Sequence, residues 1–132
     1  MLARILLIPF VAFLGMMVYL ANKGQLPPAL SFYVHLPFGD KIGHFILMGI
    51  FSFLATWALK AKTIPFKAVQ LPLGAVIVLT LVVLEEASQA FIPLRTFSLF
   101  DLGADLLGIF TFGWLAIQLY PNKTARSDQP DL

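Results

Sequence analysis

The chain has 132 residues, of which 59% are hydrophobic and 12% are charged, and its formal net charge at pH 7 is +2. A soluble domain usually carries about 45–50% apolar and about 25% charged residues, so this composition indicates a single-domain integral membrane protein. The sequence has no cysteine, which excludes disulfides and thiolate chemistry. Its small net charge and lack of a basic stripe lead us to expect no nucleic-acid partner.

Four apolar segments predict four transmembrane helices, because a crossing needs about 20 mostly apolar residues. They run from about Leu2 to Ala21, Ile42 to Leu59, Val69 to Leu84, and Leu102 to Tyr120. The third is the least apolar, and we expect it to continue as helix to about Ala90. The first has a longer apolar run than a signal peptide and no clear cleavage site, so we interpret it as a retained helix.

These segments predict an all-α integral membrane protein with four transmembrane helices in a compact bundle. Residues 1–121 would form the transmembrane domain. Residues 122–132 are polar, and we expect them to form a disordered cytoplasmic tail.

Basic residues divide unevenly between the two sides that four crossings would create. The side with both termini and the middle loop carries Arg4, Lys60, Lys62, Lys67, Lys123 and Arg126, and the other carries Lys23, Lys41 and Arg95. The positive-inside rule therefore predicts that both termini are cytoplasmic. We expect the outer loop of residues 22–40 to lie at the membrane interface because of its aromatic residues. The outer loop of residues 90–100 is unusually apolar, and we expect it to lie at the interface or to tuck over the helix bundle. The middle loop should be a short basic turn.

Polar side chains recur at the three helix ends that would face outward together. Asp101 and Asp105 are spaced i, i+4, as are Asp40 and His44, and a shorter i, i+3 spacing relates Glu86 and Gln89, so each pair shares a helix face. Ionisable groups near a bilayer are costly and are usually kept for a reason. The candidate binding cluster consists of Asp40, Lys41, His44, Glu86, Gln89, Arg95, Asp101 and Asp105.

Several members of this cluster also have purely structural explanations. Asp40 and Asp101 would suit helix caps, and Arg95 would tie down its loop by pairing with Glu86, Asp101 or Asp105. His44 alone is as compatible with a buried, hydrogen-bonded side chain as with a ligand. Asp105 is the hardest to explain, because it lies one turn inside an apolar helix beside a like charge. We expect it to be paired with Arg95 or His44, or protonated.

The charge balance narrows the chemistry of this cluster without fixing it. Its acidic excess suits a cation, an amine, sugar hydroxyls or a shared-proton network better than phosphate capture. Histidine with carboxylates can bind zinc or manganese, but a two-ligand spacing such as His-x-x-x-His is absent from the sequence, so no metal or cofactor is predicted. Phosphate-loop, dinucleotide and serine-hydrolase motifs are also absent, and acid–base work by Glu86, Asp105 or His44 stays open.

Two patterns resemble the VanZ-like family of small bacterial membrane proteins. One is Asp40-Lys41-x-x-His44, and the other is Glu86-x-x-Gln89, then Pro93-x-Arg95, then Asp101-x-x-x-Asp105-x-x-Gly108. The chain has Asp105 where the family usually has asparagine. The resemblance implies a multi-pass protein of the bacterial inner membrane with an envelope-related role, in a family linked to glycopeptide and teicoplanin resistance. It does not supply a reaction.

Three functions therefore compete at this point. The first is an outward-facing polar site that binds or acts on a cell-envelope component, such as a lipid-linked or cell-wall ligand. The second is a structural or accessory membrane protein whose polar network only fixes helix packing. The third is an ion or proton-coupled carrier. Apart from the lipid bilayer, the sequence identifies no partner, and it leaves the oligomeric state and enzymatic activity open.

Overall fold

The computed structural model describes residues 2–25, 27–31, 38–93 and 99–121 of the chain. This part folds into four long helices, one short helix and a two-stranded hairpin. The elements are α1 Leu2–Asn22, α2 Pro28–Ser31, α3 Gly39–Ala58, β1 Thr63–Phe66, β2 Val69–Pro72, α4 Leu73–Gln89 and α5 Leu99–Leu119.

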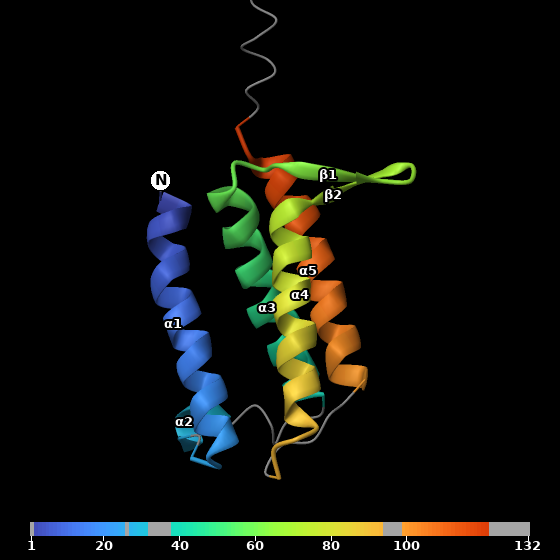
Figure 1. The fold of residues 1–132 in the computed structure, drawn as a ribbon. Helices are drawn as coiled ribbons and strands as arrows, with labels where there is room; N and C mark the ends of the chain where they lie inside the picture. The colour runs from blue at the N-terminus through green and yellow to red at the C-terminus, as the bar shows by residue number, and fades with distance from the viewer. Residues whose placement is uncertain (1, 26, 32–37, 94–98, 122–132) are drawn as a thin grey trace, which may run out of the picture.

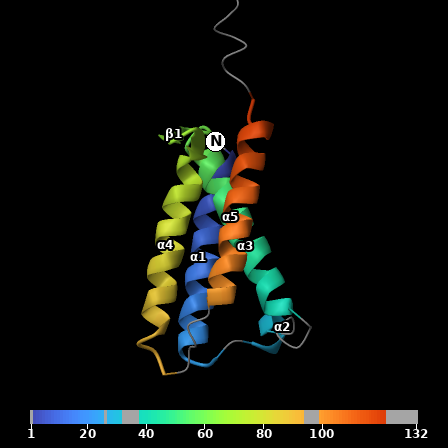
Figure 2. The same cartoon turned by 90° about the vertical axis from the view of Figure 1, so that its right-hand side faces the viewer.

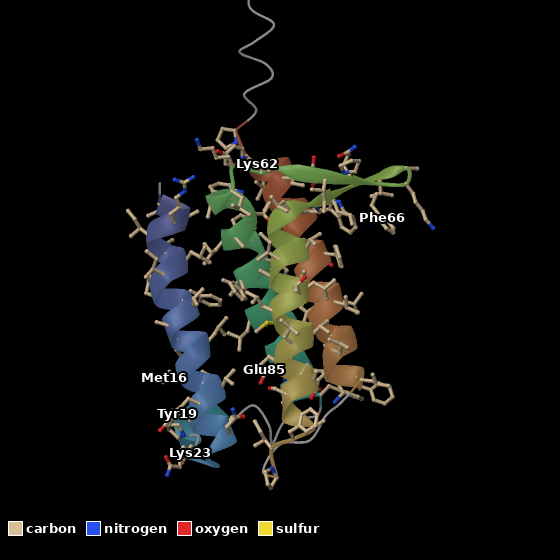
Figure 3. The ribbon with its side chains drawn as sticks, in the orientation of Figure 1. Met16, Tyr19, Lys23, Lys62, Phe66 and Glu85 are labelled. Atoms are coloured by element: carbon tan, nitrogen blue, oxygen red, sulfur yellow. The ribbon has the colours of Figure 1, made fainter. Side chains whose placement is uncertain are left out.

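The four long helices run alternately up and down, so that the bundle has two distinct ends (Figures 1 and 2). The hairpin end carries the start of α1, the strands β1 and β2, and the end of α5. The α2 end carries α2, the start of α3, the end of α4 and the start of α5. Helix α3 packs against each of the other three long helices. In Figure 3, Lys62 and Phe66 lie at the hairpin end, and Tyr19, Lys23 and Glu85 lie toward the α2 end.

Three of the described helices, α1, α3 and α5, are long and apolar enough to cross a membrane. Helix α4 has 17 residues, which corresponds to about 25 Å of helix, somewhat less than the hydrocarbon core of about 30 Å. By helix length and hydropathy the chain is therefore a multi-pass membrane protein. The predicted four-helix bundle is present, with its helix boundaries shifted by a few residues.

The segment between α3 and α4 differs most from the sequence prediction. The predictions of a simple basic turn and of a helix that begins at Val69 were both wrong, because Thr63–Phe66 and Val69–Pro72 pair as an antiparallel hairpin. Proline inside a helix removes a backbone hydrogen bond, so Pro72 sets the start of α4 at the next residue. Lys67 takes the positive φ of 53° that a two-residue hairpin loop requires of at least one residue.

Close approach of α3 and α5 forms the centre of the bundle. A Cβ atom on Gly108 would overlap the backbone carbonyl of Phe45, and one on Gly49 would overlap the ring of Phe112. Small residues at such contacts let helix backbones meet, which is how membrane helices gain van der Waals attraction without a hydrophobic driving force. The buried apolar residues beside this contact are Ala55, Ala75, Val78, Val82 and Ile109.

Two neutral hydrogen bonds reinforce the same interface. The Ser52 hydroxyl donates to the Ile109 carbonyl at 2.6 Å, and the Trp57 indole donates to the Ala116 carbonyl at 2.8 Å. Both acceptors are backbone atoms of α5, so they fix the height of α3 against it. Helix α1 is attached differently, through Arg4, which donates from its Nε to the Ala58 carbonyl at the C-terminal end of α3.

We expect Gly108→Ala to destabilise the protein by about 1–3 kcal/mol, because the new methyl group would meet the backbone of α3, which cannot move aside without separating the helices. Chemical unfolding in detergent measures the change. Gly103→Ala on the same helix is the matched control, because its Cβ would meet nothing within 4 Å. The control should be neutral or more stable by up to about 1 kcal/mol. Equal stability of the two variants would contradict close α3–α5 contact at Gly108.

Candidate functional site

Three ionisable side chains from three different helices meet toward the α2 end of the bundle. They are His44 of α3, Glu86 of α4 and Asp105 of α5, and one nitrogen or oxygen atom of each lies within 4.8 Å of the other two. Glu86 is 2% exposed and Asp105 is 1% exposed, so both carboxyl groups are buried. We call these three residues the triad.

The helix ends explain why these residues meet. His44 lies in the second turn of α3 and Asp105 in the second turn of α5, while Glu86 lies in the last turn of α4. Because α4 runs opposite to α3 and α5, its last turn lies at the same end of the bundle as their first two turns (Figure 1). The close α3–α5 contact then brings the histidine to the aspartate.

The imidazole of His44 is held between two carboxyl groups of α5. Its Nδ1 lies 2.9 Å from Asp105 Oδ1, which is hydrogen-bonding distance. Its Nε2 lies 4.0 Å from Asp101 Oδ2, and Lys41 Nζ lies 3.5 Å from Asp101 Oδ1. Helix α3 thus offers basic groups one turn apart, and α5 offers acidic groups with the matching spacing.

The α4 side of the triad is less completely bonded. Gln89 Nε2 donates to Glu85 Oε2 at 2.8 Å and lies 3.5 Å from Glu86 Oε1. The other oxygen, Glu86 Oε2, is buried and has no hydrogen-bond partner among the described residues. A buried carboxylate oxygen without a partner costs free energy, so an occupant that satisfied it would be favoured.

The predicted cluster is therefore assembled in part. His44, Glu86 and Asp105 form its centre, and Lys41, Gln89 and Asp101 surround them. The pairing of Asp105 with His44, one of the expected alternatives, is confirmed. The expected pairing of Arg95, and the side chain of Asp40, lie outside the described residues.

Two predicted helix caps are wrong, because both helices begin earlier than the hydropathy pattern indicated. Phe38 takes the N-cap position of α3, which makes Asp40 the second residue of that helix. Helix α5 begins at Leu99, so Asp101 lies in its first turn, where it contacts Lys41 and His44. An acidic group in that turn still interacts favourably with the helix dipole.

Sequence reasoning missed two features of the site. Glu85 was left out of the candidate cluster, whereas it is half-buried and accepts the amide hydrogen of Gln89. His44, Glu86 and Asp105 were predicted to belong to one cluster, but their potential as a shared set of metal ligands was missed, because ligands were expected at a fixed spacing along one helix. The available signal was the equal height of the three polar helix ends.

One imidazole and two buried carboxyl groups can act in three ways. They can share protons, receive a cationic or polar ligand, or coordinate a metal ion. In and directly around the triad, the acidic side chains of Glu85, Glu86, Asp101 and Asp105 outnumber the basic ones of Lys41 and His44, which favours a positively charged or hydrogen-bond-donating occupant.

Comparison with known proteins does not assign a function to this site. No family model, curated protein or solved structure matches the chain. The resemblance to the VanZ-like family therefore remains an expectation based on the motifs quoted above.

We expect Asp105→Asn to lower the free energy of unfolding by about 1.5–3 kcal/mol, the range for a hydrogen bond to a charged group. The loss stays below that for an isolated buried charge, because a histidine without its carboxylate can become neutral. Unfolding should be followed in detergent with a chelator present, so that bound metal cannot contribute.

Asp101→Asn is the control, since its carboxyl group is more exposed and 4.0 Å from the ring, and it should cost less than about 1 kcal/mol. A double-mutant cycle with His44→Gln should give a coupling energy of about 0.5–3 kcal/mol for Asp105. Additive effects would mean that the His44–Asp105 contact contributes nothing to stability.

Proposed function

We propose that this chain is a VanZ-like protein of the bacterial inner membrane in which all four long helices cross the bilayer. Both termini and the hairpin would be cytoplasmic, and the triad would lie near the outer face. The site would bind or act on a polar group of a cell-envelope component, such as a lipid-linked or cell-wall ligand.

The distribution of side chains along the bundle supports this orientation. The hairpin end carries Arg4, Lys60, Lys62 and Lys67, whereas the described residues of the α2 end carry Lys23 and Lys41. Positive residues are enriched in short cytoplasmic loops. Trp57, Trp114 and Tyr120 also gather near the hairpin end, as aromatic residues do at a membrane–water interface.

The exposed side chains of α4 support a fourth crossing. Ile77, Leu81 and Leu84 are exposed on a helix that also packs against α3 and α5. Apolar side chains exposed along such a helix suit contact with lipid rather than water. The helix is short, and the strands that precede it would lie at the interface.

The observation that carries the functional proposal is the unsatisfied Glu86 Oε2 within the triad. A polar network that served packing alone would be expected to satisfy its buried atoms, because each unpaired one weakens the bundle. A binding site keeps an atom open for its ligand. The structural alternative draws its support from the Lys41–Asp101 and His44–Asp105 contacts, which connect α3 to α5.

Reporter fusions test the orientation. A fusion in the hairpin loop after Lys67 and a fusion at Leu132 should both behave as cytoplasmic, because four crossings return the chain to its starting side. A fusion at Pro27 should report the outside. A periplasmic signal from the C-terminus would overturn both the four crossings and the outward placement of the site.

A cellular comparison tests the function. Lipid and peptidoglycan-precursor profiles of deletion cells should differ from those of wild-type cells, and the wild-type gene should restore them. We expect Glu86→Gln to fail to restore the profile, although the folded amount of protein is unchanged. Lys23→Gln is the control, because it also removes one charge at the α2 end but lies outside the candidate cluster, and it should restore the profile. Full restoration by folded Glu86→Gln and His44→Gln would favour the structural role.

A further inference from the structure

We infer that His44, Glu86 and Asp105 hold a divalent transition-metal ion of the zinc or manganese type. The inference names an occupant of the site proposed above, and it rests on the proposal that this cluster binds a ligand rather than only packing helices. It stands on the juxtaposition of three metal-capable groups and on a buried oxygen that the protein leaves unpaired.

The distances within the triad are close to those between ligands of a common ion. Ligand atoms bind zinc at about 2.0–2.2 Å, so two ligands of one ion lie roughly 3–4 Å apart. His44 Nδ1 and Asp105 Oδ1 are 2.9 Å apart, and one atom of Glu86 lies within 4.8 Å of atoms from both residues. Binding of one ion would separate the His44 and Asp105 atoms slightly and draw the Glu86 carboxylate closer to both.

Burial and charge point in the same direction. Glu86 and Asp105 are almost fully buried in the helix bundle, where two ionised carboxylates without a cation would repel each other. A divalent ion would neutralise both charges and would give Glu86 Oε2 the partner that the described residues do not provide. A metal ion from the solvent could reach such a site, because His44 is only half-buried.

The surrounding contacts resemble the outer shell of a metal site. A histidine that coordinates through one ring nitrogen usually donates a hydrogen bond from the other to a carboxylate or carbonyl. Here Nε2 of His44 lies on the side of Asp101, which Lys41 in turn contacts. On the other side, Gln89 lies 3.5 Å from Glu86 Oε1 and leaves Oε2 for the ion.

The ligand types select the class of metal. One imidazole with two carboxylates, and no thiolate, suits zinc or manganese. Magnesium and calcium prefer oxygen ligands throughout, so they should compete poorly for a site with a histidine. The alternative occupants are a shared proton and an amine of an organic ligand. If either one occupies the site, the purified protein should not bind added metal.

Metal binding to the purified full-length chain in detergent tests the inference directly. Zn²⁺ and Mn²⁺ should each bind saturably with about one ion per chain, measured by elemental analysis after dialysis and by competition with a chelating dye. At a metal concentration of 100 times Kd, the bound ion should also raise the unfolding temperature, since it binds only the folded state. Mg²⁺ and Ca²⁺ at the same concentration should do neither.

Substitutions locate the ion. His44→Gln, Glu86→Gln and Asp105→Asn should each weaken binding by at least about 100-fold, because loss of an outer-shell partner alone costs about 10–100-fold. Asp101→Asn should weaken it by about tenfold. Lys23→Gln, which removes a charge at the α2 end but outside the candidate cluster, should leave it unchanged. Circular dichroism and gel filtration establish which variants are folded.

Two results would overturn the inference. One is folded wild-type protein that binds neither Zn²⁺ nor Mn²⁺ saturably, a result that does not depend on whether any variant folds. The other is binding that the three substitutions leave unchanged, which would place the ion elsewhere on the chain.

The two proposals fail in different ways. In one result the wild-type protein binds no metal, and folded Glu86→Gln fails to restore the envelope profile. It would contradict the metal site and leave the proposed function intact. The opposite result is metal binding that depends on the triad together with an envelope profile that deletion of the gene does not change. It would support the metal site and contradict the proposed function.

Discussion

The contact between α3 and α5 is the constraint on which the rest of the structure depends. Gly108 lies directly against the backbone of Phe45, the residue that follows His44, and it is three residues beyond Asp105. The separation that this glycine allows is therefore also the separation that brings imidazole and carboxyl to 2.9 Å. Packing and site geometry share one origin, so a change that parts the helices would also open the site.

Helix α4 adds a different kind of group to this contact. Its start packs closely on α3, because a Cβ atom on Gly74 would overlap the backbone of Ala55 and Thr56. Its end brings Glu86 beside the His44–Asp105 pair, and there the side chains are polar and buried rather than apolar. Electrostatic interactions are stronger in such a poorly hydrated setting, so a bound cation would be held more firmly than at the surface.

Hydropathy predicted the long helices well, because each crossing needs an extended apolar run and little else resembles one. It failed between Thr63 and Pro72, since an apolar hairpin and the start of an apolar helix have similar composition, and only the proline marked the boundary. The spacing of the polar residues predicted that each pair would share a helix face, and their position at helix ends predicted that they would share one height. It could not predict that atoms of His44, Glu86 and Asp105 would lie within 4.8 Å, because that distance is set by packing between helices.

The neutral hydrogen bonds of the bundle show what packing alone requires. Ser52 and Trp57 of α3 each donate to a backbone carbonyl of α5, and neither places an ionisable group in the interior. Another contact between these helices, His44 to Asp105, uses two ionisable groups, and beside it lies a third, Glu86, with a buried oxygen that no described residue satisfies. A sequence selected only for stability would be expected to use such neutral hydrogen bonds here as well. Local departures from stable packing are typical of functional sites, and this departure occurs where three helices meet.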